Sequence, residues 1–422
     1  MRKKFNSSLW TYDFTVITIG SLVSLVGANL STFAISLLVL DYTGSTLLYA
    51  LFNVCYQLPM LVCPILAGPY LDRVSRKKAV YVLDYTSSAI YLLLFILLRS
   101  GWFNYPILLT GCMLIGCING IYQVAYESFY PNLIPKGYYQ KAYSVSSILI
   151  PLAAMMNPVA ATIYDLAGSA TPIFAINATC FFVAACFERT IRHQETHMDS
   201  ASSVAGERTL HRFRRDFREG IDYIWNEKGL LIITLYFVIG NFIYGIDTLH
   251  LPFFRNNSHL FAAWPVAAVT LYSIVTNFNV CGRLVGGMIQ YKVHFPKEKK
   301  FAIAIFVYCT ICLLDSAVLF LPVPVMCISF FVQGVLSITS YNIRISATQA
   351  YVPDTKRARF NGTFHMMTAL GSIVGSLTAG SLGEFLPERA ILIGANIFNL
   401  LMIYLLMYRG RKHVARIYNQ DL

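Results

Sequence analysis

The stretch Phe14–Leu40, FTVITIGSLVSLVGANLSTFAISLLVL, contains no charged residue. It is longer than the roughly 20 residues that a helix needs to cross the hydrocarbon core of a bilayer. Similar blocks recur along the chain, in which 56% of the residues are hydrophobic and 13% are charged. A soluble protein carries about a quarter charged residues, and barrel strands are only about ten residues long with alternating polarity. The sequence therefore predicts an all-α integral membrane protein.

Twelve apolar blocks are predicted to span the membrane, six in each half of the chain. The first six are residues 14–40, 47–71, 79–98, 105–126, 139–163 and 172–187, and the second six are residues 230–254, 264–291, 301–321, 324–350, 361–386 and 389–408. We expect an N-terminal six-helix bundle over residues 1–187, a cytoplasmic linker over 188–229, a C-terminal six-helix bundle over 230–408 and a cytoplasmic tail over 409–422. In the linker, apolar residues at helical spacing predict an amphipathic helix on the membrane surface; they are Leu210, Phe213, Phe217, Ile221 and Ile224.

The basic residues predict the orientation of these spans. With both termini in the cytoplasm, 28 of the 33 Lys and Arg residues lie in cytoplasmic segments, and the opposite side holds only Arg99, Arg255 and Arg389. This asymmetry follows the positive-inside rule in every loop. The net charge of +12 is therefore interpreted as a topology signal, and no nucleic-acid partner is expected.

The loop after the second block reads Gly68-Pro69-Tyr70-Leu71-Asp72-Arg73-Val74-Ser75-Arg76-Lys77-Lys78. It resembles the signature loop of the major facilitator superfamily, G-x-x-x-D-R-x-G-R-[RK], with Ser75 in place of the usual glycine. The resemblance implies a conformational latch in which Asp72 contacts the N-terminal end of the eleventh span, where unpaired N–H groups favour an anion. The latch residues implied in this way are Gly68, Asp72, Arg73, Arg76, Lys77 and Asn361, near which that span is expected to begin. The alternative is a solvated loop whose basic residues only set the orientation.

The two halves resemble each other, as the internal repeats of secondary transporters do. Ile134-Pro135 follows the fourth block and Val352-Pro353 follows the tenth, each with a basic residue at similar spacing beyond it. In the second half, Gly286–Lys292 is a remnant of the signature loop, with Gln290 at the Asp position. We therefore expect two pseudo-symmetric bundles and no second latch.

The fifth block resembles a degraded form of the superfamily's antiporter motif, G-x-x-x-G-P-x-x-G-G. Small residues there would allow close packing between helices; the packing positions are Ala153, Asn157, Pro158 and Ala161. This motif is associated with exporters, and nearly the whole chain resembles a branch that includes bacterial macrolide-efflux and enterobactin-export proteins. The position of Asp84 and the stretch Tyr130–Pro135 add to that resemblance.

Ionisable residues inside spans are costly and usually paired or functional. Glu127 and Arg344 lie at matching depths in the fourth and tenth blocks, and we hypothesise an ion pair between them that protonation of Glu127 would break. Arg283 is an alternative partner for Glu127. For Asp84 we favour a structural contact with Arg73 or Arg76.

A second candidate for proton coupling lies on the seventh block. Asp247 and His250 are three residues apart and share a helix face, and a carboxylate beside an imidazole can exchange protons near neutral pH. The alternative is a polar helix end near the outer headgroups. Asp315 and Asp165 rank lower as candidates. For Glu127, the alternative is contact with interfacial water or with basic loop residues.

Polar and aromatic residues of the first, fourth, seventh and tenth blocks are expected to line the substrate cavity. The candidates are Asn29, Asn119, Tyr122, Gln123, Asn241, Tyr244, Gln333 and Asn342. Rings with few fixed charges suit an apolar or amphipathic ligand.

These features predict a multi-pass plasma-membrane transporter, a monomer that exports amphipathic or hydrophobic small molecules, including multiple drugs, as a proton antiporter working by alternating access. The alternatives are an importer or facilitator on the same fold and a non-transporting membrane sensor. No nucleotide-binding loop or catalytic triad is present, so neither an enzyme nor a cofactor is expected. No metal site is expected either; Cys309 and Cys312 form a CxxC inside an apolar block, where a disulfide or metal role is disfavoured.

Overall fold

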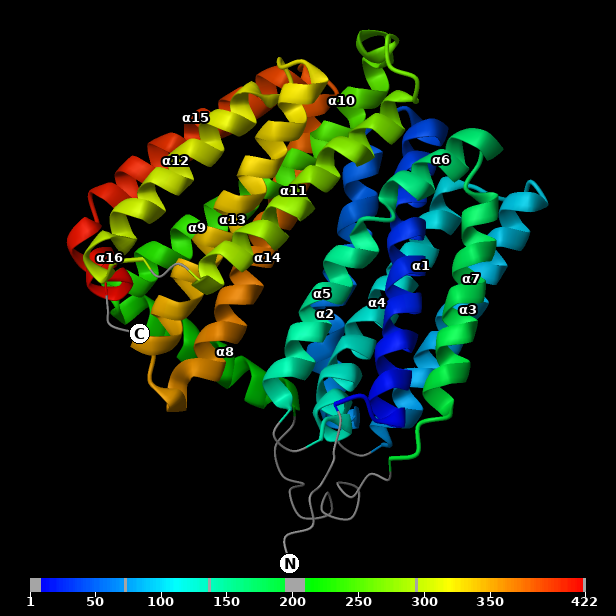
Figure 1. The fold of residues 1–422 in the computed structure, drawn as a ribbon, viewed down its shortest axis with the longest axis horizontal. Coiled ribbons are helices and arrows are strands. Elements are labelled where there is room, and N and C mark those ends of the chain that lie inside the picture. The colour runs from blue at the N-terminus through cyan, green and yellow to red at the C-terminus, as the bar shows by residue number, and fades with distance from the viewer. Residues whose placement is uncertain (1–8, 72–73, 136–137, 194–208, 293–294, 420–422) are drawn as a thin grey trace, which may run out of the picture. The chain divides into compact units, whose positions relative to one another are not determined.

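The computed structural model describes residues 9–71, 74–135, 138–193, 209–292 and 295–419, and all regular structure in these ranges is helical (Figure 1). Eleven of the described helical segments are long and apolar enough to cross a membrane. The helix α11 (Ala268–Lys292) matches the eighth predicted block and is not among the eleven, since it carries Asn277, Asn279 and Arg283. An all-helical membrane fold is thus confirmed for the described residues.

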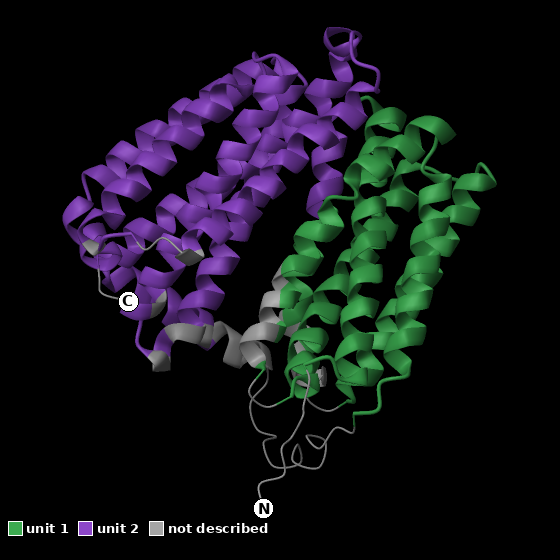
Figure 2. Ribbon diagram, viewed as in Figure 1, with its two compact units in different colours: residues 1–44, 55–209 green, residues 45–54, 210–422 purple. Residues whose placement is uncertain are grey.

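The chain divides into two compact units (Figure 2), which are described separately. Unit 1 consists of residues 1–44 and 55–209. Its helices are α1 (Tyr12–Thr43), the larger part of α2 (Thr46–Leu71), α3 (Arg76–Arg99), α4 (Tyr105–Phe129), the short η1 (Tyr130–Leu133), α5 (Tyr139–Ala154), α6 (Asn157–Ala167) and α7 (Thr171–Arg189).

Unit 2 consists of residues 45–54 and 210–422. The first turns of α2 and the whole of α11 belong to this unit. Its other helices are α8 (Thr209–Asn226), α9 (Lys228–Ile246), η4 (Asp247–Leu249), α10 (His250–Asn256), η5 (Ser258–Phe261), η6 (Lys297–Lys299), α12 (Lys300–Val318), α13 (Val323–Tyr351), α14 (Asp354–Gly383), α15 (Glu388–Met402), the π-helical η7 (Ile403–Tyr408) and α16 (Arg411–Tyr418).

The helices of the two units pair in the same order. In unit 1, α3 packs on α4 and α7, and α1 packs on α5, α6 and α7. In unit 2, α12 packs on α13 and α15, and α9 packs on α14 and α15. If α9 continues through α10 as one span, each contact in one unit has its counterpart six spans later in the other. This repetition is the packing that the sequence repeat predicts.

Close helix contacts in both units depend on glycine. A Cβ at Gly375 on α14 would lie 1.9 Å from the carbonyl oxygen of Phe242 on α9, and one at Gly116 on α4 would lie 2.3 Å from that of Tyr56 on α2. No side chain fits at such distances, because a real Cβ essentially never approaches within 3.0 Å of another atom. Small residues therefore set the interaxial spacing, as in other membrane bundles.

The fifth predicted span is not one continuous helix. It ends as α5 at Ala154 and restarts as α6 at Asn157, with Pro158 in the first turn of α6. The break has a local cause, since proline has no N–H to continue the hydrogen-bond ladder. Ala153 and Ala161 are fully buried, and α5 and α6 both pack on α1 within unit 1.

Two helix starts depart from or refine the expectation. Ser75, which replaces a glycine of the family loop, accepts a hydrogen bond from the Lys78 N–H at 3.0 Å and caps α3. The eleventh predicted span begins earlier than expected, because α14 starts at Asp354, directly after Pro353. Lys and Arg have a high helix propensity. The polar residues between Pro353 and the apolar block, which the hydropathy pattern left out of the predicted span, are therefore helical too. The expectation of a helix start near Asn361 is therefore wrong.

Candidate functional site

Three ionisable side chains meet inside unit 2. Asp247 and His250 come from η4 and the start of α10, where α9 is interrupted by a 3₁₀ turn, and Asp315 comes from α12. One ligand-type atom of each residue lies within 4.8 Å of those of the other two. His250 Nε2 is 3.7 Å from Asp315 Oδ1, and both side chains are buried. The structure thus brings the two predicted residues together with a third that ranked lower in the sequence.

A fourth residue orients this group. The Nδ2 of Asn396, on α15, donates a 2.8 Å hydrogen bond to Asp315 Oδ2. His250 Nδ1 lies 2.7 Å from the backbone oxygen of Asp247, a contact that requires Nδ1 to carry the proton if the ring is neutral. His250 Nε2 and Asp247 Oδ1 are buried and have no hydrogen-bond partner. We name Asp247, His250, Asp315 and Asn396 the unit 2 cluster.

A second buried group lies in unit 1. Glu188, at the end of α7, is completely buried and accepts a 3.0 Å hydrogen bond from the Tyr122 hydroxyl to its Oε1. Asp84 on α3 is 2% exposed and interacts electrostatically with Glu188. Asp84 Oδ2 and Glu188 Oε2 have no hydrogen-bond partner, and neither carboxyl group forms an ion pair with a described Lys or Arg. We name Asp84, Glu188 and Tyr122 the unit 1 cluster.

The structure does not support a contact between Asp84 and Arg76. Arg76 instead donates from Nη1 to the carbonyl oxygen of Ser128 at 3.1 Å. Asp84 lies two helical turns into α3, where its side chain is directed into unit 1 beside Glu188. The alternative partner Arg73 lies outside the described residues, as does Asp72. Gly68 is in the last turn of α2.

The described part of the predicted latch shows contacts to backbone oxygens. Lys77 donates from Nζ to the Ile191 carbonyl oxygen at 2.5 Å. Asn361 lies inside α14, about two turns from its first residue, and not at a helix N-terminus. A helix end is the part that attracts an anion, so the role predicted for Asn361 loses its geometric basis. The latch itself stays a prediction.

The predicted gate residues occupy contrasting surroundings. Glu127 is exposed in unit 1 and accepts a 2.9 Å hydrogen bond from Gln123. Arg344 in unit 2 is 5% exposed, and its guanidinium carbon lies 4.6–5.3 Å from the centres of three rings, those of Phe237, Tyr341 and Phe364. Arg283 is exposed on α11. The ion pair between Glu127 and Arg344 stays a prediction.

The candidate cavity residues fall into two groups. Most are tied to their own unit by hydrogen bonds: Asn29 to Leu25, Asn119 to Tyr56, Tyr122 to Glu188, Asn241 to Phe237, Asn342 to Gln290 and, at 3.5 Å, the buried Gln333 to Ser329. Gln123 and Tyr244 are exposed, Tyr244 by 70%. Asn342 and Gln290 join α13 to α11, so the residue at the degenerate Asp position serves as a helix–helix amide contact.

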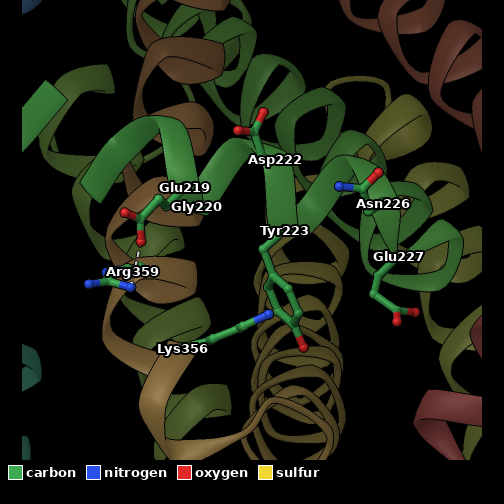
Figure 3. Close-up of a pocket in the computed structure, with 8 residues that line it drawn as sticks. All are labelled: Glu219, Gly220, Asp222, Tyr223, Asn226, Glu227, Lys356 and Arg359. Carbon is green, nitrogen blue, oxygen red and sulfur yellow. Dashed lines mark ion pairs between the residues drawn. The ribbon is translucent and has the colours of Figure 1, made fainter. Parts of the chain in front are cut away.

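The linker helix α8 contacts α14 and encloses a pocket of about 380 Å³ with it (Figure 3). Glu219 pairs with Arg359 Nη1 at 2.6 Å, and Lys356 Nζ lies 4.6 Å from the centre of the Tyr223 ring. Ile224 is buried in the core of unit 2, so this end of the apolar face packs on protein instead of lipid. Phe213 and Leu210 have side chains outside the described set. Charged side chains of both signs line the pocket.

One carboxylate is placed outside the spans. Glu384, just after α14, accepts hydrogen bonds through Oε1 from the Leu47 N–H at 3.0 Å and the Ser45 hydroxyl at 2.6 Å, at the start of α2. These donors hold the pKa of Glu384 below its usual value. All of these residues belong to unit 2.

Sequence reasoning missed Glu188 and Asn396 and placed Asp315 too low. Glu188 sits one residue beyond the predicted sixth span, so it counted as part of the linker. Gly20 of α1 lies directly beside it, since a Cβ there would be 3.3 Å from Glu188 Cγ. No periodic signal marks these residues, because each cluster is assembled from separate helices.

Comparisons with known proteins agree with this architecture. Residues 17–319 match the family model described as Major Facilitator Superfamily. A Bacillus subtilis (strain 168) relative, named an uncharacterized MFS-type transporter, YkuC, is 24% identical over 289 residues. That match covers 67% of this chain and 66% of the relative, slightly less than two thirds of its length.

Solved structures share the fold at low identity. The nucleoside transporter NupG has a TM-score of 0.69 and 13% identity, covering 94% of this chain and 98% of that one. The peptide transporter POT in complex with sulfate has a TM-score of 0.70 and 14% identity, covering 99% and 97%. A bacterial homologue of the human lysosomal transporter Spinster, inward-facing and unoccupied, has a TM-score of 0.60 and 13% identity, covering 97% and 98%.

Proposed function

This chain belongs to the Major Facilitator Superfamily, and we propose that it is a secondary active transporter that uses protons to export amphipathic or hydrophobic small molecules by alternating access. In this proposal α11 is the twelfth span and both termini lie in the cytoplasm, as the loop charges favour. The protein acts as a monomer in the plasma membrane. The bacterial relative named above is compatible with that location.

The observation that carries proton coupling is the unit 1 cluster. Two carboxyl groups are buried together, and no described Lys or Arg forms an ion pair with them. Two unpaired negative charges inside a bilayer would be very costly, so such groups take up protons instead. The Tyr122 hydroxyl can donate to Glu188 when that carboxyl group is ionised, which gives a single negative charge a partner. The pair can therefore alternate between proton-loaded and partly ionised states.

The direction and substrate class follow from weaker features. The fifth span keeps the proline of the exporter-type motif and breaks there, between α5 and α6. The candidate cavity residues are amides and phenols, which suit ligands with few fixed charges. Export of multiple drugs is one form of this activity.

The experiment is transport in everted membrane vesicles that contain the full-length protein. A panel of fluorescent amphipathic compounds is added outside, and an inside-acid pH gradient is imposed. We expect accumulation that requires the protein and collapses when nigericin removes the pH gradient but not when valinomycin with potassium removes the electrical potential. Vesicles from cells without the protein are the control.

The rival functions predict different results. Release of preloaded substrate under the same gradient, or flux that persists without any gradient, would show an importer or a facilitator. Absence of flux for every compound, with the protein present and folded, would favour a membrane sensor. A flux that is driven only by the membrane potential would contradict proton coupling by the unit 1 cluster.

A further inference from the structure

We propose that Asp247, His250 and Asp315 form a binding site for one divalent transition-metal ion within unit 2. Their ligand-type atoms lie within 4.8 Å of one another. Ligand atoms on a tetrahedral ion with bonds of about 2.0–2.2 Å lie about 3.4 Å apart, so these side chains would have to move together by up to about 1.4 Å to hold an ion. One imidazole and two carboxylates suit Zn²⁺, Mn²⁺, Fe²⁺ and Co²⁺.

The strongest support for this site comes from the hydrogen-bond contacts of His250. His250 Nδ1 faces the Asp247 carbonyl oxygen at 2.7 Å, an acceptor, and so Nδ1 holds the proton in a neutral ring. Nε2 then carries the lone pair, and it lies 3.7 Å from Asp315 Oδ1. An ionised carboxylate also offers only lone pairs. Three acceptors therefore lie close together, and a bound metal ion is one group that satisfies all of them at once.

Charge and surroundings agree with a doubly charged ion. His250 is 4% exposed and Asp315 is 5% exposed, and the +2 charge of a dication equals in size the −2 charge of the two ionised Asp side chains. His250 is held by the Asp247 carbonyl oxygen and Asp315 by Asn396 Nδ2. Such outer hydrogen bonds orient the ligands of metal sites. Two buried polar atoms of this cluster, His250 Nε2 and Asp247 Oδ1, have no hydrogen-bond partner.

The site has an open edge. Asp247 is only half-buried, and Tyr244, one turn earlier on α9, is 70% exposed. Three protein ligands leave at least one position on the metal free, as in sites where a metal meets water or substrate. The 3₁₀ turn η4 (Asp247–Leu249) breaks the helix at the site itself, a feature common at ion sites of transporters.

The proposal does not depend on proton-driven export, because its test needs no transport. The full-length protein is purified through a tag without histidine, stripped with a chelator and titrated with Co²⁺ at pH 7.5. We expect one Co²⁺ per chain, with the visible absorption bands of a four- or five-coordinate nitrogen–oxygen site. Zn²⁺ should displace the Co²⁺, and binding should weaken as the pH falls, because protons compete for the same lone pairs.

Variants assign the binding to these residues. His250→Gln should lower the Co²⁺ affinity at least about tenfold, since even outer-shell changes cost 10–100-fold. Asp315→Asn should do the same, and His259→Gln, which changes an exposed histidine of the same unit, should leave the affinity unchanged. Variants are compared only if they remain monodisperse with a cooperative melting transition.

Either of two results would overturn the proposal. One is that the wild-type protein binds no Co²⁺, Zn²⁺ or Mn²⁺ at millimolar concentration. The other is that folded His250→Gln binds Co²⁺ with the same affinity as the wild-type protein. If both site variants fail to fold, electron spin echo measurements on the wild-type protein decide instead. Coupling of the bound ion to an imidazole nitrogen supports the site, and its absence rejects it. Proton-driven flux without metal binding would leave the transport function standing and remove this site alone.

Discussion

The two buried clusters occupy equivalent helix pairs in the two units but differ in their hydrogen-bond chemistry. The unit 1 cluster joins α3 to α7, the third and sixth spans, through Asp84 and Glu188. The unit 2 cluster joins α12 to α15, the ninth and twelfth spans, through Asp315 and Asn396. In unit 1 the acids lie near the start of α3 and the end of α7, whereas in unit 2 the polar residues lie near the end of α12. The repeated pairing of helices thus carries polar groups at opposite ends.

This difference in hydrogen-bond donors indicates which cation each cluster suits. In unit 1, the Tyr122 hydroxyl is a donor that can stabilise one ionised carboxylate, so gain and loss of a proton are both accommodated. In unit 2, Asn396 already donates to the far oxygen of Asp315, and the inner atoms are all acceptors. A cluster of acceptors is satisfied by a bound cation and not by ionisation alone. The two proposals thus place the transported proton in unit 1 and the metal ion in unit 2.

The largest effect is expected from removing both acids of the unit 1 cluster. The double variant Asp84→Asn and Glu188→Gln keeps the size of both side chains but cannot bind or release a proton. We expect gradient-driven accumulation to fall by about 5–150-fold, which is the change in affinity that a typical coupling free energy between two sites produces. Substrate exchange between the two sides, measured without a gradient, should persist.

The control for this variant is Glu127→Gln, which changes an exposed carboxylate of the same unit. It should retain most of the gradient-driven flux if the buried pair carries the proton. Equal loss in both variants would move the proton site to Glu127 and revive its predicted gate role. If transport by the double variant keeps the full pH dependence of the wild-type protein, the proton does not bind at the unit 1 cluster.

An intermediate effect is expected from Asn396→Ala. The substitution removes the donor to Asp315 Oδ2 but no proposed metal ligand. We expect the Co²⁺ affinity to fall by about tenfold, the lower end of the range for outer-shell residues, with the visible bands preserved. Titration of the purified variant measures this. An unchanged affinity would show that Asn396 does not orient the carboxylate, and a lost spectrum would place it among the ligands.

The smallest effect is expected from Glu384→Gln, where a carboxylate is exposed and not buried. Hydrogen bonds from Leu47 and Ser45 lower the folded-state pKa of Glu384, so its contact stabilises the fold above the unfolded-state pKa of about 4.3 and is lost as the pH falls through the lower folded-state pKa. Solvent screening limits the gain to about 0.5 kcal/mol.

Thermal melting across pH checks this prediction. Wild-type protein should melt slightly above Glu384→Gln at pH 7, and the two melting temperatures should converge once the pH falls below the lowered folded-state pKa of Glu384. Gln keeps the acceptor oxygen, so the difference reports the charge. A difference that persists unchanged at acid pH would assign the effect to packing at the start of α2.

Much of the fold could be predicted because membrane helices are specified locally. Long apolar blocks such as Phe14–Leu40 have no other stable arrangement in a bilayer, and nearly all of them are helices at about the expected positions. The predicted helix boundaries are wrong where proline or helix propensity overrides the hydropathy pattern. Pro158 divides the fifth span, and the polar residues after Pro353 extend α14 beyond the apolar block.

The candidate sites could be predicted only in part. Asp247 and His250 share a helix face three residues apart, and that spacing is visible in the sequence. Asp315 and Glu188 gain their significance from partners more than sixty residues away, which no periodicity reports. The pairing predicted for Asp84 followed sequence proximity to Arg76, whereas the side chain turns into the bundle toward α7.

The sequence by itself determined the helical membrane class, the internal repeat and the family resemblance of the Gly68–Lys78 loop, because hydropathy and local motifs need no knowledge of distant contacts. Only the tertiary structure decided which ionisable groups are buried together: Asp84 with Glu188, and His250 with Asp315. Burial and hydrogen-bond direction determine what a carboxylate or imidazole can bind, and both are set by the helices that pack around it.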